Sequence, residues 1–253
     1  MFPLFKSHYS VGRSILTLAN PSSVVSGGSS SVFDIASRHS LERLVLVEDS
    51  LIGLLEAKRR SDELDIPFVF GLRLDMCNDI SKDPKESSSH KIIVFAKNSI
   101  GLRLLNRIYT QAQTVGRGRL DFTALKSLYS EEDLKIAIPF YDSFVFQNLF
   151  SYGEPCLLDD SYFSPTFFIE DNLLPIDVPL RAAVKKYCGS TFKIELVKSI
   201  YYENREDFEA YQTYKCICGR GFSTKSKTLD VPNLDHCGSP EFCFESYLDY
   251  ERS

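Results

Sequence analysis

The stretch Arg43–Asp75 constrains the fold most, because it predicts a strand, a helix and a second strand in succession. Leu44–Val47 is a continuous apolar run, typical of a strand buried on both faces. Apolar residues of Leu51–Ala57 then recur at helical spacing opposite a charged side, and Pro67 ends the helix. Phe68–Leu72 is the second strand. Two strands joined by a crossover helix form a right-handed parallel unit, which places its chemistry at the carboxyl ends of the strands.

Strands and helices keep alternating along the rest of the chain, which predicts a parallel sheet. The further predicted strands are Phe2–Lys6, Lys91–Lys97, Leu134–Phe140, Thr166–Ile169 and Phe192–Ile200. The further predicted helices are Ser31–Arg38, Asn98–Gln113, Phe122–Leu128, Ser143–Phe150, Val178–Tyr187, Glu206–Cys216 and one in the tail. The lack of an obvious linker favours a closed, irregular α/β barrel over an open sheet. We expect one domain over residues 1–253, with a Ser/Gly-rich loop at about 20–31 and a C-terminal extension at about 220–253.

Composition narrows the class of protein. An apolar content of 43% and a charged content of 25% are ordinary for a globular protein, and no apolar run approaches the roughly 20 residues of a membrane span. The first ten residues lack the layout of a signal peptide, and the odd number of seven cysteines indicates reduced thiols. We therefore expect a cytoplasmic protein with no membrane partner. The net charge of −5 gives no general attraction for nucleic acid, so any such contact has to be local.

Candidate metal ligands are sparse. None of the four histidines lies within metal-ligand spacing of another, so each is more simply a surface or hydrogen-bonded residue. A thiolate zinc site could in principle use Cys216, Cys218, His236, Cys237 and Cys243. Their spacing fits neither usual zinc pattern, and a cysteine on an apolar helix is ordinarily a small buried side chain.

Glu48 and Asp49 form an acidic pair at a predicted strand end, where a site is expected. Carboxylates there could bind magnesium. Neighbours on a strand point to opposite faces, so only one of them can face the mouth of a barrel. The favoured interpretation is a solvated or capping role.

Four arginines surround a glycine-rich turn: Arg103, Arg107, Arg117 and Arg119. Arginines gathered in this way could contact phosphate. Arg103 and Arg107 are one helical turn apart and could equally form a solvated face. No phosphate-binding loop, nucleophile elbow or dinucleotide fingerprint accompanies them.

Four stretches carry a family resemblance. They are IPFVFGL (Ile66–Leu72), HKIIVFAKNSIGLRLL (His90–Leu105), YYENREDFEAYQTYKCI (Tyr201–Ile217) and TLDVPNLDHCGSPEFCFES (Thr228–Ser246). In this order they resemble the PHP domain at the N-terminus of bacterial DNA polymerase III alpha subunits, over nearly the whole chain. The resemblance implies a PHP barrel, which is a distorted parallel (β/α) barrel.

Active members of that family bind up to three metal ions and hydrolyse phosphoesters, in some polymerases as a 3′–5′ exonuclease. The positions that correspond to the family's motifs are Leu4, Lys6, Glu48, Asp49, Arg73, His90, Ser199 and Tyr201. Only His90 falls on a matching histidine, and Glu48 and Asp49 keep only the acidity of their motif. Lys6 and Arg73 place cations where metal charge should lie. We expect them to pair with Glu48 or Asp49 and close the barrel mouth.

The resemblance therefore implies a non-catalytic, structural and protein-docking module of a polymerase III-type replicase, with no cofactor. Its expected partners are a polymerase III-type catalytic chain and a proofreading exonuclease subunit, and its DNA contact is indirect or weak. A split replicase of a phage or mobile element would explain a separate, degenerate PHP domain. The alternative is a phosphoesterase or 3′–5′ exonuclease with zinc or manganese in a rebuilt site of Glu48, Asp49, His90 and Asp142.

Overall fold

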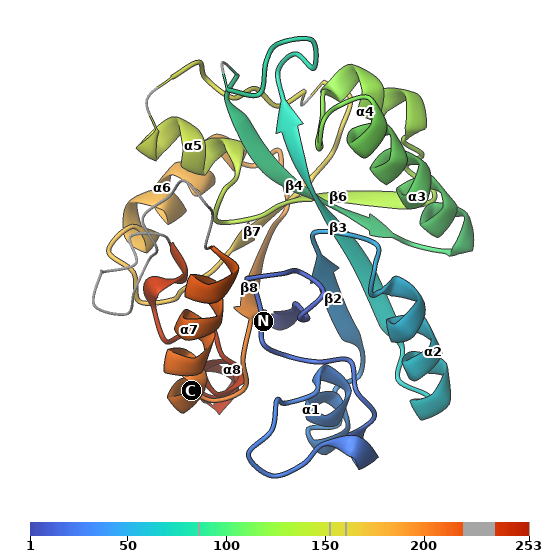
Figure 1. Cartoon of the computed structure of the whole chain (residues 1–253). Coiled ribbons are helices and arrows are strands. Elements are labelled where there is room, and N and C mark those ends of the chain that lie inside the picture. The colour runs from blue at the N-terminus through green and yellow to red at the C-terminus, as the bar shows by residue number, and fades with distance from the viewer. Residues whose placement is uncertain (86, 152, 160, 220–235, 253) are drawn as a thin grey trace. The chain divides into compact units, whose positions relative to one another are not determined.

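The computed structural model describes residues 1–85, 87–151, 153–159, 161–219 and 236–252 (Figure 1). Its strands are β1 (Phe2–Phe5), β2 (Leu44–Glu48), β3 (Phe68–Cys77), β4 (Ser89–Ala96), β5 (Arg119–Leu120), β6 (Leu134–Ile138), β7 (Thr166–Ile169) and β8 (Ile194–Ile200). Its helices are α1 (Val32–Arg38), α2 (Leu54–Leu64), α3 (Ser99–Thr114), α4 (Phe122–Leu128), α5 (Phe144–Phe150), α6 (Asp177–Cys188), α7 (Phe208–Cys218) and α8 (Phe244–Arg252). Helices and strands therefore alternate along most of the chain, but no helix separates β3 from β4 among the described residues.

Local capping chemistry places several helix ends where the sequence predicts them. Ser31 caps α1 and Asn98 caps α3, each accepting a hydrogen bond from a backbone N–H of the first turn. Ser143 caps α5 in the same way, and α6 ends immediately before Gly189. The predicted starts of α1, α3 and α5 are confirmed because a cap depends only on residues close in sequence. α6 is one residue longer at each end than the predicted helix Val178–Tyr187.

The sheet is closed but is not wholly parallel. The strand order is β2-β1-β8-β7-β6-β4-β3-β5, and β2 also pairs with β3, so seven strands close a ring of hydrogen-bonded pairings, as in a barrel. β1 runs parallel to β2 and β8, and β7 runs parallel to β6 and β8. β4 is antiparallel to both β3 and β6. The predicted mixed α/β barrel is confirmed, and the prediction of a parallel sheet is wrong at β4.

The reversal at β4 has a local cause. A parallel pair of strands needs a crossover of a dozen or more residues, usually with a helix. The described residues between Cys77 and Ser89 contain no helix and return the chain directly, so β4 runs back along β3.

The chain divides into two compact units. The first comprises Met1–Val69, Asp171–Leu174 and Val197–Ser253, and the second comprises Phe70–Glu170 and Pro175–Leu196. The prediction of a single domain over residues 1–253 stays a prediction. Residues 220–235 of the predicted C-terminal extension lie outside the described residues, and α8 lies within that extension.

Helices cover a short parallel sheet in the first unit. The Phe5 ring of β1 stacks on Phe244 of α8 at 5.7 Å between centroids. α2 buries Ala57 and Ser61, which are one turn apart, so Leu55 on the opposite side is 81% exposed. The prediction that the apolar residues of Leu51–Ala57 face inward is therefore wrong for Leu55. It is also wrong for Ile52, which precedes α2 and is exposed.

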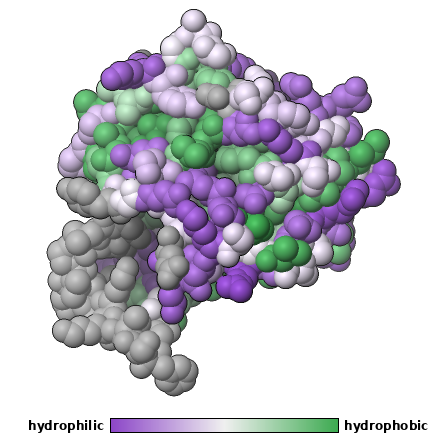
Figure 2. All heavy atoms as spheres, turned by 90° about the horizontal axis from the view of Figure 1, so that it is seen from above, coloured by the Kyte–Doolittle hydropathy of each residue, from purple (hydrophilic) through white to green (hydrophobic). Residues whose placement is uncertain are grey.

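The core of the second unit contains a cluster of aromatic side chains. Phe144 of α5 contacts Phe167 of β7 and Tyr187 of α6, with ring centroids 6.1 and 4.9 Å apart. α3 buries Leu105 and Ile108, whereas Ile100 is exposed. Further large hydrophobic side chains reach solvent, and Figure 2 shows hydrophobic and hydrophilic side chains mixed on one face. None of the described helices is long and apolar enough to cross a lipid bilayer.

Candidate functional site

The ends of β1 and β2 bring an ammonium and a carboxylate together in the first unit. The strands are parallel neighbours, with Phe5 opposite Leu46. Lys6 therefore emerges beside Asp49, and Lys6 Nζ lies 3.0 Å from Asp49 Oδ2. The Lys6 side chain is 4% exposed and that of Asp49 is 29% exposed. The predicted pairing of Lys6 with an acid of this motif is confirmed.

Glu48 is an internal hydrogen-bond acceptor. Its carboxylate accepts from the backbone N–H of Ser7 at 2.8 Å and from the hydroxyl of Ser10. Ser10 Oγ in turn accepts from the backbone N–H of Asp49 at 3.0 Å. Burial raises the pKa of Glu48, while the nearby Lys6 and the serine hydrogen bonds act in the opposite direction. Of the favoured interpretation, a solvated or capping role, the solvated part is wrong for Glu48 because its side chain is buried. The capping part agrees with the hydrogen bond from the Ser7 backbone.

The other first-unit positions of the family's motifs carry few metal-binding groups. Leu4 lies opposite Ser199 in the β1–β8 ladder and is buried. Tyr201 is also buried, and its ring stacks on Phe242 at 5.3 Å between centroids. Leu4 has no lone pair to offer, and Tyr201 serves in an aromatic stack. These side chains, together with the cation of Lys6, do not fit a metal cluster.

Arg73 pairs with an acid of the second unit. Arg73 Nη2 lies 2.7 Å from Asp142 Oδ2, and the two side chains are 8% and 23% exposed. This ion-pair partner comes from the turn after β6. The pairing of Arg73 with Glu48 or Asp49 stays a prediction. Asp142 adopts a left-handed conformation with φ of 61°, which an aspartate tolerates better than most residues.

His90 lies in an aromatic environment. It is 1% exposed, and its ring is 6.1 Å from Phe122 and 5.9 Å from Phe144 between centroids. Neither ring nitrogen has a hydrogen-bond partner among the described residues. Burial lowers the pKa of His90 to about 4, so the ring is neutral at pH 7. These contacts give no support to His90 as a metal ligand.

The cysteines do not form a metal site in the described part of the chain. Cys218 is exposed and Cys216 partly exposed on α7, whereas Cys237 and Cys243 are buried. The side chain of His236 lies outside the described residues. The described residues contain no group of three or more histidine, cysteine or acidic side chains that could hold a metal ion.

The four predicted arginines separate into two groups. Arg103, Arg107 and Arg117 are exposed, whereas Arg119 is 6% exposed in β5. Arg119 Nη2 donates to the carbonyl of Lys82 at 2.8 Å. Arg119 is therefore a buried structural residue, and the prediction that it contacts phosphate on an exposed cluster is wrong.

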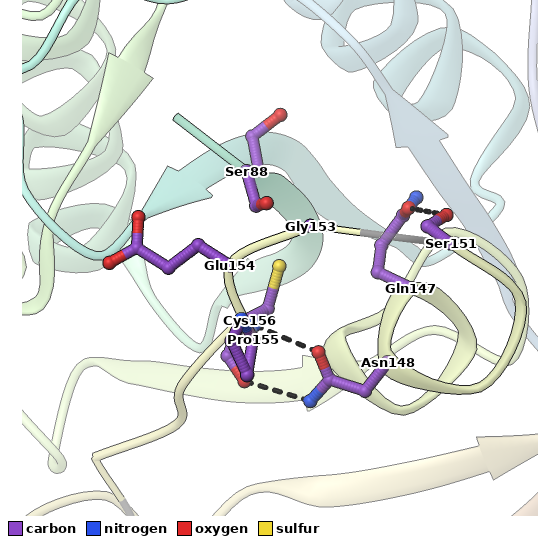
Figure 3. A pocket seen from close by; sticks show the side chains of 9 residues that line it. Ser88, Gln147, Asn148, Ser151, Gly153, Glu154, Pro155 and Cys156 are labelled. Carbon is purple, nitrogen blue, oxygen red and sulfur yellow. Dashed lines mark hydrogen bonds between the residues drawn. The ribbon is translucent and has the colours of Figure 1, made fainter. Parts of the chain in front are cut away.

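One cavity in the second unit has no counterpart in the sequence prediction. It measures about 140 Å³ and lies between the start of β4 and the loop after α5 (Figure 3). Asn148 closes the loop by bonding both backbone groups of Cys156, and Gln147 accepts from Ser151 at 2.8 Å. Burial raises the pKa of the Cys156 thiol, so the thiol stays protonated. No motif points to this cavity, because its lining comes together only through the tertiary fold.

Each of the two units contains one of these ion pairs. Lys6, Asp49 and Arg73 occupy positions that the family resemblance assigns to metal ligands. Asp142 belongs only to the alternative rebuilt site. Comparison with protein-family models and with curated proteins finds no match for this chain.

Proposed function

We propose that the chain is a non-catalytic, PHP-like module of a DNA polymerase III-type replicase, acting as a structural and protein-docking domain. The observation that carries the proposal is the Lys6–Asp49 ion pair, with 3.0 Å between the charged atoms and Lys6 almost fully buried. A buried ammonium neutralises its neighbouring carboxylate and repels a divalent cation.

Arg73 supports the same proposal from the second unit. Its guanidinium neutralises Asp142, the acid of the proposed rebuilt site that lies in the same unit. A guanidinium cannot lose its proton under ordinary conditions, so a metal ion cannot displace that charge by deprotonating it. Both ion pairs therefore favour a structural role.

The proposed partners follow from the family resemblance. They are a polymerase III-type catalytic chain and a proofreading exonuclease subunit, in the cytoplasm. Hydrolysis of phosphoesters in this family depends on metal-activated water, so the module would contribute binding surface instead of chemistry.

Metal content is the first test. The purified full chain is dialysed against zinc and then manganese, freed of loose metal, and measured by elemental analysis. We expect far less than one equivalent of either metal. Two or more equivalents, together with metal-dependent cleavage of single-stranded DNA that is lost in His90→Ala, would replace this proposal with the phosphoesterase alternative.

Docking is tested separately, because a metal-free chain need not bind a polymerase. The full chain is mixed with a polymerase III-type catalytic chain and run on a size-exclusion column. A polymerase of an unrelated family serves as the control. Co-elution with the first polymerase alone is the expected result, and co-elution with neither contradicts the docking role.

A further inference from the structure

One exposed face of α3 carries arginine, asparagine and threonine side chains. Six exposed residues lie within one side of the helix and its C-terminal turn, and we call them the α3 arginine stripe: Arg103, Asn106, Arg107, Thr110, Thr114 and Arg117. Their spacing of three or four residues is that of one helical face. Arg103 to Thr114 spans about 16 Å along the helix axis, the length of about five base pairs.

The stripe has no acidic counterpart within its own segment. Residues 98–120 contain four arginines and no aspartate or glutamate, although the whole chain has a net charge of −5. Within the described residues, the guanidinium groups of Arg103, Arg107 and Arg117 take part in no ion pair or hydrogen bond. Three exposed cations are therefore available to an external partner.

Acids that adjoin α3 have other roles. Asp133 accepts from the side chain of Asn98 at 2.9 Å, at the N-terminal end of the helix. Asp121 accepts from the backbone N–H of Ala124 as the cap of α4, which packs beside α3 (Figure 1). The threonine hydroxyls of the stripe donate to carbonyls of their own helix, so the arginines supply the attraction.

Arg117 occupies a conformation that arginine rarely adopts. Its φ is 53°, and it stands between two glycines at the end of α3. A Cβ on Gly116 would come within 1.7 Å of the Arg119 carbonyl, so glycine is required at that position. A left-handed conformation is unfavourable for a residue that carries a side chain, and such strain often accompanies function. The turn therefore holds an arginine side chain out at the end of the stripe at a cost to stability.

We infer that the α3 arginine stripe binds the phosphate backbone of a nucleic acid. Arginine, asparagine and threonine are side chains that contact phosphate and sugar. A helix that binds a membrane surface needs a free apolar face, and the apolar face of α3 is buried through Leu105, Ile108 and Ala112. Contacts with phosphate and sugar carry no sequence information, so we expect the binding to be independent of sequence.

The α3 arginine stripe contains none of the residues of the Lys6–Asp49 and Arg73–Asp142 ion pairs. Nucleic-acid binding by the stripe therefore does not rest on the proposed function. The stripe also corrects the predicted arginine cluster, since the buried Arg119 is not part of the surface.

Fluorescence anisotropy tests directly whether the α3 arginine stripe binds nucleic acid. The full chain is titrated into a labelled mixed-sequence duplex and, separately, into a labelled single strand. Three phosphate contacts predict slopes of log K against log salt of about −2.7 for the duplex and about −2.1 for the single strand. For the duplex, this corresponds to a loss of about 40-fold between roughly 50 and 200 mM salt.

Two triple variants separate the stripe from net charge. Arg103→Gln/Arg107→Gln/Arg117→Gln removes the exposed cations of the stripe. Arg59→Gln/Lys185→Gln/Lys186→Gln removes the same charge from α2 and α6, where these side chains are exposed. We expect the first variant to weaken binding about tenfold or more at low salt, and the control to change it less than about twofold.

Three results would overturn the inference. One is no binding by the wild-type chain at low salt, and a second is an equal loss in both variants. The third is binding to anionic phospholipid vesicles but not to either oligonucleotide. Circular dichroism of both variants confirms that the substitutions leave the fold intact.

Discussion

The ammonium of Lys6 lies 3.0 Å from a carboxylate oxygen of Asp49, and this ion pair joins the ends of two adjacent strands. Removing one member of a buried pair leaves the other charge unpaired and partly desolvated. Lys6→Gln should therefore lower the free energy of unfolding by about 2 kcal/mol, less than for a fully buried pair because Asp49 is 29% exposed. Urea unfolding measures the change.

Lys58→Gln is the matched control, because Lys58 pairs with Asp62 on the exposed side of α2. It should cost less than about 0.5 kcal/mol. Equal effects of the two substitutions would show that the Lys6–Asp49 pair contributes no more than a surface pair.

The Arg73–Asp142 pair is tested by a double-mutant cycle. Arg73→Ala and Asp142→Asn each remove one charge, and asparagine also tolerates the left-handed conformation of residue 142. We expect each single variant to be less stable by about 2–3 kcal/mol, with a coupling energy of about 1–2 kcal/mol. Purely additive losses in the unfolding free energy would mean that the two side chains do not stabilise each other.

Because of His90, the free energy of unfolding should fall at acidic pH. Because burial lowers the pKa of His90 from 6.5 to about 4, the unfolded chain binds a proton in this range that the folded chain does not. The His90 contribution is therefore complete above pH 6.5 and is lost as the pH falls toward 4, by up to about 3 kcal/mol. Thermal unfolding of the wild type and of His90→Phe at several pH values gives the difference.

His90→Phe should be as stable as the wild type near pH 7 or more stable, since neither ring nitrogen has a partner among the described residues. His90→Leu is a second variant, made because the larger phenylalanine ring could fit the buried position poorly. Parallel pH profiles of the wild type and both variants would contradict the assignment of this acid dependence to His90.

Arg205 precedes α7 and binds acidic residues in and before α8. The two helices are orange and red in Figure 1. The Arg205 guanidinium makes two bonds to Glu241, at 3.0 and 2.9 Å, and pairs with Asp249 at 2.8 Å. Lysine cannot make this paired contact, so Arg205→Lys should cost about 1–2 kcal/mol, discounted for partial exposure.

The same variant should change the response to acid. Arg205 lowers the pKa of Glu241, so its contribution is present above the ordinary glutamate range and is lost as the pH falls. In Arg205→Lys we expect a smaller loss of unfolding free energy between neutral and acidic pH. An unchanged dependence of the unfolding free energy on pH would show that Arg205 does not control the titration of Glu241.

Thiol labelling should follow burial. Cys218 is exposed and Cys216 partly exposed, so these should react with a thiol reagent first. The buried cysteines are Cys77, Cys156, Cys188, Cys237 and Cys243. Burial also raises the pKa of Cys188 and Cys243 to about 11, which keeps both thiols protonated. Mass spectrometry after brief labelling identifies the sites, and fast modification of Cys243 would contradict the packing of α8.

Local features of the fold were predictable from the sequence, whereas partners distant in sequence were not. Ser31 and Asn98 mark helix starts because a cap involves only the next few residues. The orientation of β4 was missed because alternation was interpreted as a series of crossovers. Arg73 finds Asp142, 69 residues away, and no local pattern links the two.

The exposure of single side chains was the least predictable property. Arg107 and Arg119 belong to one arginine-rich segment, yet the first is exposed on α3 and the second is buried in β5. Leu55 lies within an apolar run but on the outer side of α2. Which side of a helix is covered depends on its neighbours in space, and a single sequence does not contain that information.

The reversed strand β4 has a consequence for the order of folding. β4 returns along β3 after a short connection, so this pairing closes a small loop and loses little chain entropy. The β1–β8 ladder instead joins Phe2 to Val197, across most of the chain. Contacts between residues close in sequence form fastest, so β3 and β4 should gain amide protection before β1 and β8 during refolding. The second unit would then provide the nucleus, and the two ends of the chain would be joined last.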